Sequence, residues 1–379
     1  EENDGEREEV DEEEEKEEKE EEEAISLVRK CSHMAVQEVA SRAQMVEDLV
    51  DELLNVFVSR ISKSFFPVPQ PAIGVGSSFE GWSPKGQDSD FHLLVPLKPP
   101  RGFLFHVEAG AGRDTAAKAH ILMELEGTCS RDQEQRRGLF LHRLCHGVLR
   151  RGEANHLCPE GSLNVEKVAR WFQCGVKSAW KKTPLASSYT MEVLPSRCSC
   201  GLKLTDSCRT TFSIQLLFGV QRGDSHVFLS SQVSEAIFTP STTWVESFTV
   251  AEKNFFSHMA RQVPQDSFHL ECLYFCASCL EGTSISHYAL KTVVMHLNFI
   301  PITHWRRRQF LSRVQDVMCY LYTCLEEKSL NHFICGNKEM PQNIILPPDV
   351  QEPQKQNLFQ HLEQDPAAHA KALEEFRDL

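Results

Sequence analysis

The pattern of apolar and charged positions after residue 24 predicts a long amphipathic helix. Apolar residues recur at steps of three and four from Val28 to Ile61, and charged residues such as Glu38 and Glu47 fall outside that stripe. This spacing places the apolar side chains on one face of a helix. The helix is expected to end before Pro67, which begins a proline-rich, extended connection.

Short apolar runs separated by turn residues predict strands in the middle of the chain. They are expected at 73–75, 91–97, 103–107, 121–125, 210–221 and 227–229. Helices are expected at 139–149 and after Ser162 or Asn164, either of which has the side chain of an N-cap. After Pro240 the spacing is mainly helical, at 244–262, 266–281, 285–299, 305–326 and 356–378.

This order of elements predicts the fold class. A spine helix, a mixed sheet and then a run of helices indicate an α+β fold with a helical C-terminal lobe. The predicted parts are a disordered acidic segment at 1–23, a core with the spine helix at 24–240, and the helical lobe at 241–379.

Residues 1–23 hold the net charge of the chain. They contain 17 Asp or Glu residues against Arg7, Lys16 and Lys19, a balance of −14. With almost nothing apolar to bury, this segment is expected to be disordered, or at most a solvated and transient helix. Removing it from the totals of 54 acidic and 40 basic residues leaves 37 of each sign. No basic run in the remainder exceeds three residues, which argues against a nucleic-acid partner.

The cysteines and the longest apolar runs bear on the cellular compartment. Several of the 14 cysteines lie in apolar periodic stretches, where a free thiol acts as a small hydrophobe, and the chain has no Asn-x-Ser/Thr sequon. Both features favour a reducing compartment. No apolar run reaches the roughly 20 residues of a membrane-spanning helix. Because the chain begins at Glu1 rather than Met, the sequence does not exclude a membrane anchor upstream of it.

Candidate chemistry is concentrated between residues 76 and 92. Gly76-Ser77 is followed by eleven loop residues and then by Ser89-Asp90-Phe91-His92. The arrangement resembles nucleotidyltransferases of the polymerase-beta type, in which Gly-Ser opens a helix that receives the nucleotide triphosphate. In those enzymes the next strand carries two acids at positions i and i+2, which share one face. With a third acid from a neighbouring strand, they hold two Mg²⁺ ions.

The acids of that pattern are incomplete in this chain. Asp90 is in place, but His92 stands at the partner position, and an imidazole offers neither negative charge nor a hard oxygen. The strand at 210–221, which should supply the third acid, contains no carboxylate, and Asp88 is a weak substitute because it lies in the loop. The residues therefore predict a vestigial motif that retains Gly76-Ser77 and one acid, with no catalytic residue, metal or cofactor.

A wider resemblance covers about nine-tenths of the chain. VGSSFEGWSPKGQDSDFHLLVPLKPP at 75–100 and LNHFICGNKEMPQNIILPP at 330–348 look like the inositol-trisphosphate receptor-interacting protein family, in particular its "like" paralogues. Further stretches that carry the resemblance are 156–173, 249–273, 289–297 and 357–376. That family belongs to the Mab-type superfamily, together with cyclic GMP–AMP synthase.

The resemblance implies properties that the residues alone do not. It implies a nucleotidyltransferase-like core, and association with a membrane through a single-pass anchor upstream of the acidic segment. The folded part would then be cytoplasmic. The family's name implies a protein partner, an inositol-trisphosphate receptor. From the family's active pattern only Gly76, Ser77 and Asp90 carry over.

Two groups of Cys and His have spacings that invite comparison with zinc sites. They are Cys198, Cys200 and Cys208 in a predicted loop, and His269, Cys272, Cys276 and Cys279 along one face of a predicted helix. The first group lacks an adjacent fourth ligand. Apolar residues surround the second group, so buried core cysteines are the favoured interpretation.

The predicted function follows from the incomplete acids and the resemblance. We expect a catalytically degenerate protein, a pseudoenzyme, that acts as a membrane-associated regulatory or interaction protein. The alternative is a nucleotide-binding sensor or a weakly active Mg-dependent nucleotidyltransferase. Lys291 stands where active relatives place a lysine near the nucleotide, and a helix-surface charge is its simpler interpretation.

Overall fold

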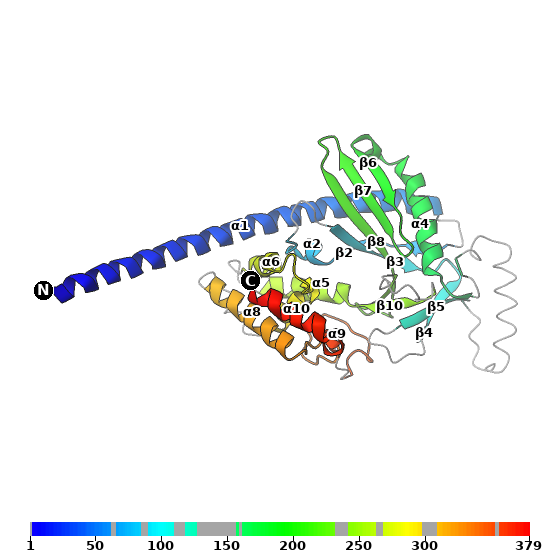
Figure 1. Ribbon diagram of the computed structural model, residues 1–379. Coiled ribbons are helices and arrows are strands. Elements are labelled where there is room, and N and C mark those ends of the chain that lie inside the picture. Colours follow the sequence, from blue (N-terminus) through cyan, green and yellow to red (C-terminus); the bar gives the residue numbers. More distant parts are fainter. Residues whose placement is uncertain are drawn as a thin grey trace.

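The computed structural model describes residues 2–61, 66–84, 90–109, 118–126, 157–158, 161–231, 242–262, 268–297, 309–352 and 356–379. For residues 2–25, 109 and 125 this description covers the backbone alone. The molecule combines a mixed sheet with a long N-terminal helix and a group of C-terminal helices, which confirms the predicted α+β class (Figure 1).

Helix α1 (Glu2–Ile61) is the predicted spine helix. Its apolar stripe lies in the core, where Val39, Leu53 and Phe57 are buried. Phe57 packs so closely on helix α4 (Val165–Trp180) that a Cβ atom at Gly175 would lie 2.0 Å from its ring. The N-terminal end of α1 projects far beyond the rest of the molecule (Figure 1).

The acidic segment continues α1 to Glu2 rather than standing apart as disordered chain. Of the two states that its composition allowed, the structure has the helical one. Glu and Lys are good helix formers, and Glu12 and Glu15 precede Lys16 and Lys19 by four residues, the spacing that stabilises a helix. A helix that is already nucleated by a packed stretch also propagates at little cost.

The strands form one mixed sheet of ten strands among the described residues. Their bounds are β1 (Val68–Pro69), β2 (Ile73–Val75), β3 (Asp90–Lys98), β4 (Phe103–Ala109), β5 (Lys118–Leu125), β6 (Tyr189–Leu194), β7 (Cys200–Asp206), β8 (Thr211–Gln221), β9 (Phe228–Ser230) and β10 (Trp244–Ser247). The main order is β1-β3-β8-β9-β10-β5-β4, with β2 also on β3 and the β6–β7 hairpin on β8. Strands β3 and β8 run parallel at its centre.

One face of the central strands is covered by α1 and α4. Phe91 and Leu93 of β3 and Ile214 of β8 are buried in one apolar cluster with Val168 and Phe172 of α4. Helix α4 begins where the Asn164 side chain accepts a hydrogen bond from the backbone N–H of Lys167 at 3.0 Å. Of the two caps that the sequence left open, Asn164 is therefore the one used.

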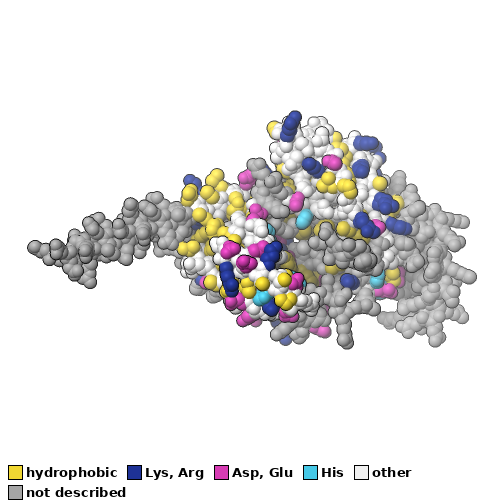
Figure 2. Space-filling model, viewed as in Figure 1, with side chains coloured by type: hydrophobic (Ala, Val, Ile, Leu, Met, Phe, Trp, Pro, Cys, Tyr) yellow, Lys and Arg dark blue, Asp and Glu magenta, His cyan; other side chains and the backbone are white. Residues whose placement is uncertain are grey.

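The C-terminal lobe has its own apolar cluster, built by the helices on the opposite side of the sheet. They are α5 (Thr249–Gln262), α6 (His269–Cys279), α7 (His287–Leu297), α8 (Phe310–Glu326), α9 (Gln360–Gln364) and α10 (Pro366–Arg377). Figure 2 shows Lys and Arg side chains gathered over the other end of the molecule, around α4 and the β6–β7 hairpin.

Three predicted elements differ from the structure. The helix expected from residue 244 begins only at Thr249, because Trp244–Ser247 pairs between β9 and β5 as strand β10. The helix expected at 356–378 is interrupted at Asp365, whose side chain caps the next helix while Pro366 occupies its first turn. The loop expected around Cys200 contains strand β7, which pairs with β6 and β8.

The predicted helix at 139–149, Asp88 and residues 305–308 lie outside the described residues. The division into an N-terminal core and a helical lobe at residue 240 stays a prediction.

Candidate functional site

The predicted Gly-Ser motif lies between two strands. The chain leaves β2 at Gly76 and forms α2 (Ser77–Glu80), a single helical turn. Gly76 has a φ of +83° with open space around it, a backbone conformation that favours glycine. The hydroxyl of Ser78 donates a hydrogen bond to the backbone oxygen of Asp90 at 3.0 Å, which ties α2 to the start of β3.

The structure brings the four predicted motif residues together. Gly76 and Ser77 follow Val75, and Val75 is the register partner of His92 in the antiparallel pair β2–β3. Asp90 and His92 are exposed on the same face of β3, as the i and i+2 spacing predicts.

Strand β8 supplies the side chains beside Asp90 and His92. In the parallel pair, Asp90 lies opposite Ser213 and His92 lies opposite Gln215. Both β8 residues are half-buried on the face that lacks the core residues Phe212 and Ile214. We call Asp90, His92, Ser213 and Gln215 the site face. β8 is the strand from which a third acid was expected, and it presents a hydroxyl and an amide there.

The amide of Gln215 is held by the β6–β7 turn. Its Nε2 donates to the Ser199 hydroxyl, which in turn shares a hydrogen bond of 2.5 Å with the Ser196 hydroxyl. From α4, Gln173 Nε2 donates to the backbone oxygens of Ser196 and Ser199 at 2.9 and 2.8 Å. A Cβ atom at Gly201 would lie 3.1 Å from Gln215 Oε1, so the amide packs against the bare backbone of β7. Gln215 is thus a fixed part of the site face.

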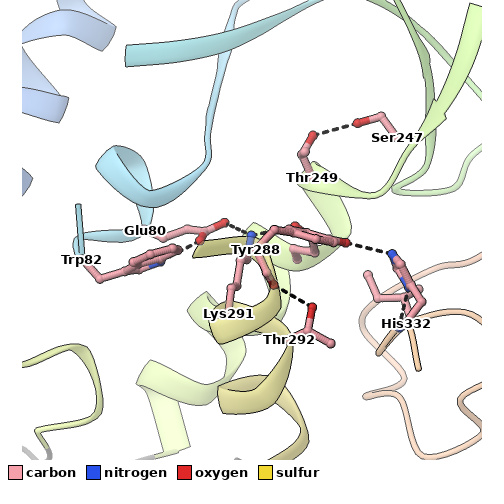
Figure 3. A network of polar contacts seen from close by, with 10 residues as sticks. Glu80, Trp82, Ser247, Thr249, Tyr288, Lys291, Thr292 and His332 are labelled. Atoms are coloured by element: carbon pink, nitrogen blue, oxygen red, sulfur yellow. Dashed lines mark hydrogen bonds and ion pairs between the residues drawn. The ribbon is translucent and has the colours of Figure 1, made fainter. Parts of the chain in front are cut away.

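A buried ionic network lies on the other side of α2 (Figure 3). The Lys291 ammonium, on α7, donates to Glu80 Oε1 of α2 and to Glu252 Oε2 of α5, both at 2.6 Å. The indole N–H of Trp82 donates to Glu80 Oε2 at 2.8 Å. Lys291 is 4% exposed, so the interpretation of this residue as a helix-surface charge is wrong.

The network extends from Glu252 to the segment that follows α8. The Tyr288 hydroxyl donates to Glu252 Oε1 at 2.7 Å and also contacts His332 Nε2 at 2.8 Å. On the other side of the imidazole, Nδ1 accepts from the backbone N–H groups of Ile334 and Cys335. An accepting Nδ1 carries no proton, which assigns the proton of neutral His332 to Nε2, where it donates to the Tyr288 oxygen.

Burial and pairing set the charges of this network. Burial alone would lower the pKa of Lys291, but the carboxylates of Glu252 and Glu80 outweigh it and hold the pKa above its ordinary value. Burial alone would raise the pKa of Glu252, but Lys291 and Tyr288 hold it below its ordinary value. Burial lowers the pKa of His332, which keeps the ring neutral near pH 7.

The network joins parts of the chain that are far apart in sequence. It connects α2, directly after the Gly-Ser motif, with two helices of the C-terminal lobe and with residues 332–335. Replacing one member of a buried ion pair leaves an uncompensated charge, which typically costs about 3–5 kcal/mol. Chemically, the network fixes α2 against the helical lobe.

Comparison with known proteins shows which proteins this chain resembles. No family model matches the chain. The chain is 31% identical over 363 residues to inositol 1,4,5-trisphosphate receptor-interacting protein-like 1 of Rattus norvegicus, covering 91% of this chain and 66% of the relative. The Mus musculus protein of the same name has the same identity and coverage. Inositol 1,4,5-trisphosphate receptor-interacting protein of Homo sapiens is 27% identical over 388 residues, 92% of this chain and 69% of the relative.

The chain belongs to the inositol 1,4,5-trisphosphate receptor-interacting protein family. It spans 66% of the length of the rat and mouse relatives. In the part of this family member that the structure describes, no helix is both long and apolar enough to cross a membrane.

The cysteines of this family member do not converge as the zinc spacings would require. Cys200 is buried at the start of β7, and burial raises its pKa to about 12. Cys208 is exposed beyond the other end of that strand, whose seven residues span about 23 Å. In α6, Cys272 and Cys276 are buried in the apolar core, as the core-cysteine interpretation predicted. Among the described residues no group of three or more His, Cys, Asp or Glu could hold a metal ion.

The network is the feature that the sequence analysis missed. Glu80, Trp82, Glu252, Tyr288 and His332 were not singled out. One signal was present: Lys291 is the single charged residue in the stretch ALKTVVMHL. A lone lysine inside such an apolar helix must be buried with a partner or must interrupt the apolar face.

Proposed function

We propose that this chain is a catalytically degenerate, nucleotidyltransferase-type protein that acts through binding a protein partner. The site face carries the proposal. At the positions where two Mg²⁺ ions would require clustered carboxylates, it offers one, Asp90, beside His92, Ser213 and Gln215. One carboxylate supplies too little negative charge to hold a metal pair against the repulsion between the two ions.

The proposed partner is an inositol 1,4,5-trisphosphate receptor, because the human relative is named for interacting with it and the rat and mouse relatives are named as like that protein. The role is then regulatory, with the folded part as the binding unit. We extend the proposal to membrane association through a segment that precedes the acidic helix, with the folded part on the cytoplasmic side.

Calorimetry tests the catalytic half of the proposal. The purified chain is titrated with ATP and with GTP in the presence of Mg²⁺, in parallel with the variant Asp90→Ala. We expect no heat of Mg²⁺-dependent binding from either protein at millimolar nucleotide. Micromolar binding that Asp90→Ala abolishes would instead establish an active-type metal site and overturn the proposal.

Binding to immobilised inositol 1,4,5-trisphosphate receptor tests the proposed protein partner. Purified inositol 1,4,5-trisphosphate receptor is exposed to this chain, with the human relative as the positive control. We expect saturable binding of this chain. If the human protein binds and this chain does not at the same concentrations, the receptor is not its partner.

A nucleotide sensor is the second candidate, favoured by the geometry of the Gly-Ser turn. Gly76 has a positive φ, and a Cβ atom placed on it would meet no other atom within 4 Å. A sensor of this kind would bind nucleotide without Mg²⁺. Its binding would survive Asp90→Ala and be lost in Gly76→Val, because a branched side chain cannot adopt that φ without strain.

A further inference from the structure

A row of basic side chains follows the outer side of α4. Lys167, Arg170, Lys177 and Lys181, which we call the cationic stripe, stand at steps of three, seven and four residues, and Cys174 occupies the remaining position of the row. At 3.6 residues per turn, these five positions fall within an arc of about 80° around the helix. That arc lies opposite the face of α4 that is buried in the core. Lys167 is half-buried, and the other residues of the row are exposed.

The ends of the helix explain only part of this row. The negative end of the helix dipole stabilises cations near the C-terminus of α4, where Lys177 and Lys181 stand. The same dipole disfavours a cation in the first turn, yet Lys167 lies there. Glu166, the one acid in the sequence of α4, forms an ion pair with Arg197. The row therefore carries positive charge that the helix itself does not use.

The described surroundings of the stripe leave its charge uncompensated. Within the described ranges, no ion pair includes one of its four cations. Arg60 adds a cation beside the stripe, because its Nη1 donates to the neutral hydroxyl of Ser178 on α4 at 2.6 Å. Lys182 follows the stripe directly and is exposed. Figure 2 shows Lys and Arg side chains gathered over this part of the molecule, which therefore presents one sign of charge to solvent.

The backbone that carries the stripe is held rigid by the packing of α4. The helix begins at the Asn164 cap, and Phe57 of α1 packs closely against Gly175 in its middle. From Lys167 to Lys181 the backbone rises by about 21 Å. A partner that binds the stripe therefore meets a preformed row of charges, and no free energy is lost in ordering α4.

The side chains around the stripe favour a protein partner over a membrane. Helices that lie on membranes insert Trp, Phe or Leu side chains beside their cations. The apolar face of α4 is instead buried in the core. Among the described residues, neither α4 nor the β6–β7 hairpin exposes a large apolar side chain. Binding to the stripe would therefore rely on charge pairing, and in a protein the matching charges are Asp and Glu carboxylates.

The acidic segment of the same molecule cannot reach the stripe. Residues 1–23 carry a balance of −14. Glu23 and Arg60 are separated by continuous helix with a length of roughly 55 Å. The free end of α1 and α4 lie at opposite ends of the molecule (Figure 1). The carboxylates that pair with the stripe must therefore come from another molecule.

We propose that the cationic stripe is the surface on which a protein partner docks an acidic segment, with a row of Asp or Glu carboxylates lying along α4. The inference deepens the proposed function and rests on it, since it takes this chain to act by binding a protein. Each pair stays in contact with water and contributes little, so the row acts through its number and spacing. Such pairs weaken as salt shortens the screening length from about 10 Å at 0.1 M toward 3 Å at 1 M.

A synthetic acidic peptide tests this docking surface on the full chain. The probe is a fluorescein-labelled helix of Ala and Gln, with Glu residues at alternating steps of three and four so that they form one row. Fluorescence anisotropy measures its binding at 50 mM and 500 mM salt. We expect saturable binding at 50 mM that is lost at 500 mM. A peptide of the same composition with its Glu residues spread around the helix should bind at least about tenfold more weakly, because fewer of them reach the stripe together.

Charge reversal locates the bound peptide. The stripe variant reverses three exposed cations of α4: Arg170→Glu, Lys177→Glu and Lys181→Glu. The control variant reverses three exposed cations of the C-terminal lobe: Arg261→Glu, Lys338→Glu and Lys371→Glu. The stripe variant should lose at least about tenfold in association constant, and the control variant should bind like the wild type. Circular dichroism confirms that both are folded, as expected for exposed substitutions.

Three results with the peptides would overturn the proposal: no binding by the wild type, equal affinity for the two peptides, or equal loss in the two variants. Two further measurements would assign the stripe to a different occupant and so overturn it as well. One is a dimer in sedimentation at 50 mM salt that the stripe variant abolishes. The other is binding to phosphatidylserine vesicles that the stripe variant abolishes, by a wild type that does not bind the peptide.

Immobilised inositol 1,4,5-trisphosphate receptor separates this inference from the proposed function. The stripe variant is expected to bind the receptor at least about tenfold more weakly than the wild type. A stripe variant that binds as tightly as the wild type would overturn the inference and leave the proposed partner in place. If the wild type itself does not bind, the receptor is not the partner, and the peptide measurements alone decide whether the stripe binds acidic segments.

Discussion

The site face and the buried network flank the same helical turn, α2, but differ in how their charges are satisfied. On the site face, the Asp90 carboxylate stands on an accessible strand surface beside neutral polar side chains. In the network, Lys291 is shared between two carboxylates at 2.6 Å and is shut away from water. A charge in the interior must be paired to persist, whereas an accessible charge is stabilised by water and needs no partner.

The two groups of charges on either side of α2 therefore have different roles, one structural and one in ligand binding. The charges in the network hold α2 in place, and those of the site face would be the ones to meet a ligand. Stability measurements should therefore respond to the network, and ligand measurements to the site face.

Removing the ammonium at the centre of the network should have the largest effect. In Lys291→Met, Glu80 and Glu252 remain buried without a cation, and the free energy of unfolding should fall by about 3–5 kcal/mol. Urea denaturation followed by circular dichroism measures it. The matched control is Lys253→Met, which breaks a 26% exposed pair with Glu47 and should cost no more than about 1 kcal/mol. Equal losses in the two variants would mean that burial does not distinguish these pairs.

Removing one hydroxyl from the network should have an intermediate effect. Tyr288→Phe deprives Glu252 of a donor and His332 Nε2 of an acceptor, at a cost of about 1–3 kcal/mol. Tyr189→Phe is the control, because that half-buried hydroxyl makes no hydrogen bond within the described structure. Thermal unfolding that places the Tyr288 variant within 0.5 kcal/mol of the control would contradict the role of the hydroxyl as a bridge; that margin is about the usual range of a surface substitution.

The free energy of unfolding should depend on pH in two separate pH ranges, one set by His332 and one by Glu252. His332 has a pKa below its ordinary value when folded, so the unfolded chain binds the proton first as pH falls through about 6.5. Stability that is present above pH 6.5 is then lost toward the lower folded pKa, by at most about 1.4 kcal/mol per pH unit. Glu252, whose folded pKa is also lowered, adds a second loss below about pH 4.5.

A substitution shows which residue causes the loss of stability in each pH range. In His332→Gln, the slope between pH 5 and 6.5 should be smaller than in the wild type, while the acid slope remains. Denaturation midpoints of the wild type and of His332→Gln, measured from pH 4 to pH 8, test this expectation. If the slope in the variant is unchanged, another buried group titrates in this pH range. His269 is a candidate, because burial lowers its pKa as well.

Adding acids to the site face should change ligand binding, at a smaller cost in stability than the loss of Lys291. In His92→Asp combined with Gln215→Glu, three carboxylates would stand on neighbouring positions of β3 and β8. We expect Mg²⁺ affinity, measured by calorimetry, to rise at least about tenfold, since a hard cation selects clustered oxygens. Without Mg²⁺ the unfolding free energy should fall by about 1–3 kcal/mol, because Gln215→Glu removes the Nε2 donor to the Ser199 hydroxyl and the three carboxylates repel one another. Loss of the new affinity in a further Asp90→Ala would locate the ion; Mg²⁺ binding unchanged from the wild type would contradict the geometry.

The fold was predictable where one local pattern dominated. The stripe from Val28 to Ile61 led directly to the buried face of α1, and the β-branched and aromatic residues of 210–221 led to β8. Strand β10 was missed because Trp244–Ser247 has no pattern of its own and is a strand only through its neighbours β9 and β5. Of the site, the sequence located the Gly-Ser turn and the strand that faces Asp90. The lone lysine in ALKTVVMHL indicated that Lys291 needs a partner if it is buried, but not that the partners are Glu80 and Glu252.

The sequence by itself determined which residue types stand on each element: one acid at Asp90, a histidine at His92, no carboxylate from 210 to 221, and a strongly acidic beginning. Only the tertiary structure decided which of them meet. Glu80 and Lys291 are 211 residues apart in the sequence, and their contact exists only because the fold packs α2 near α7. Periodicity reports on neighbours within one element, whereas a pairing across elements depends on how the whole chain excludes water from its interior.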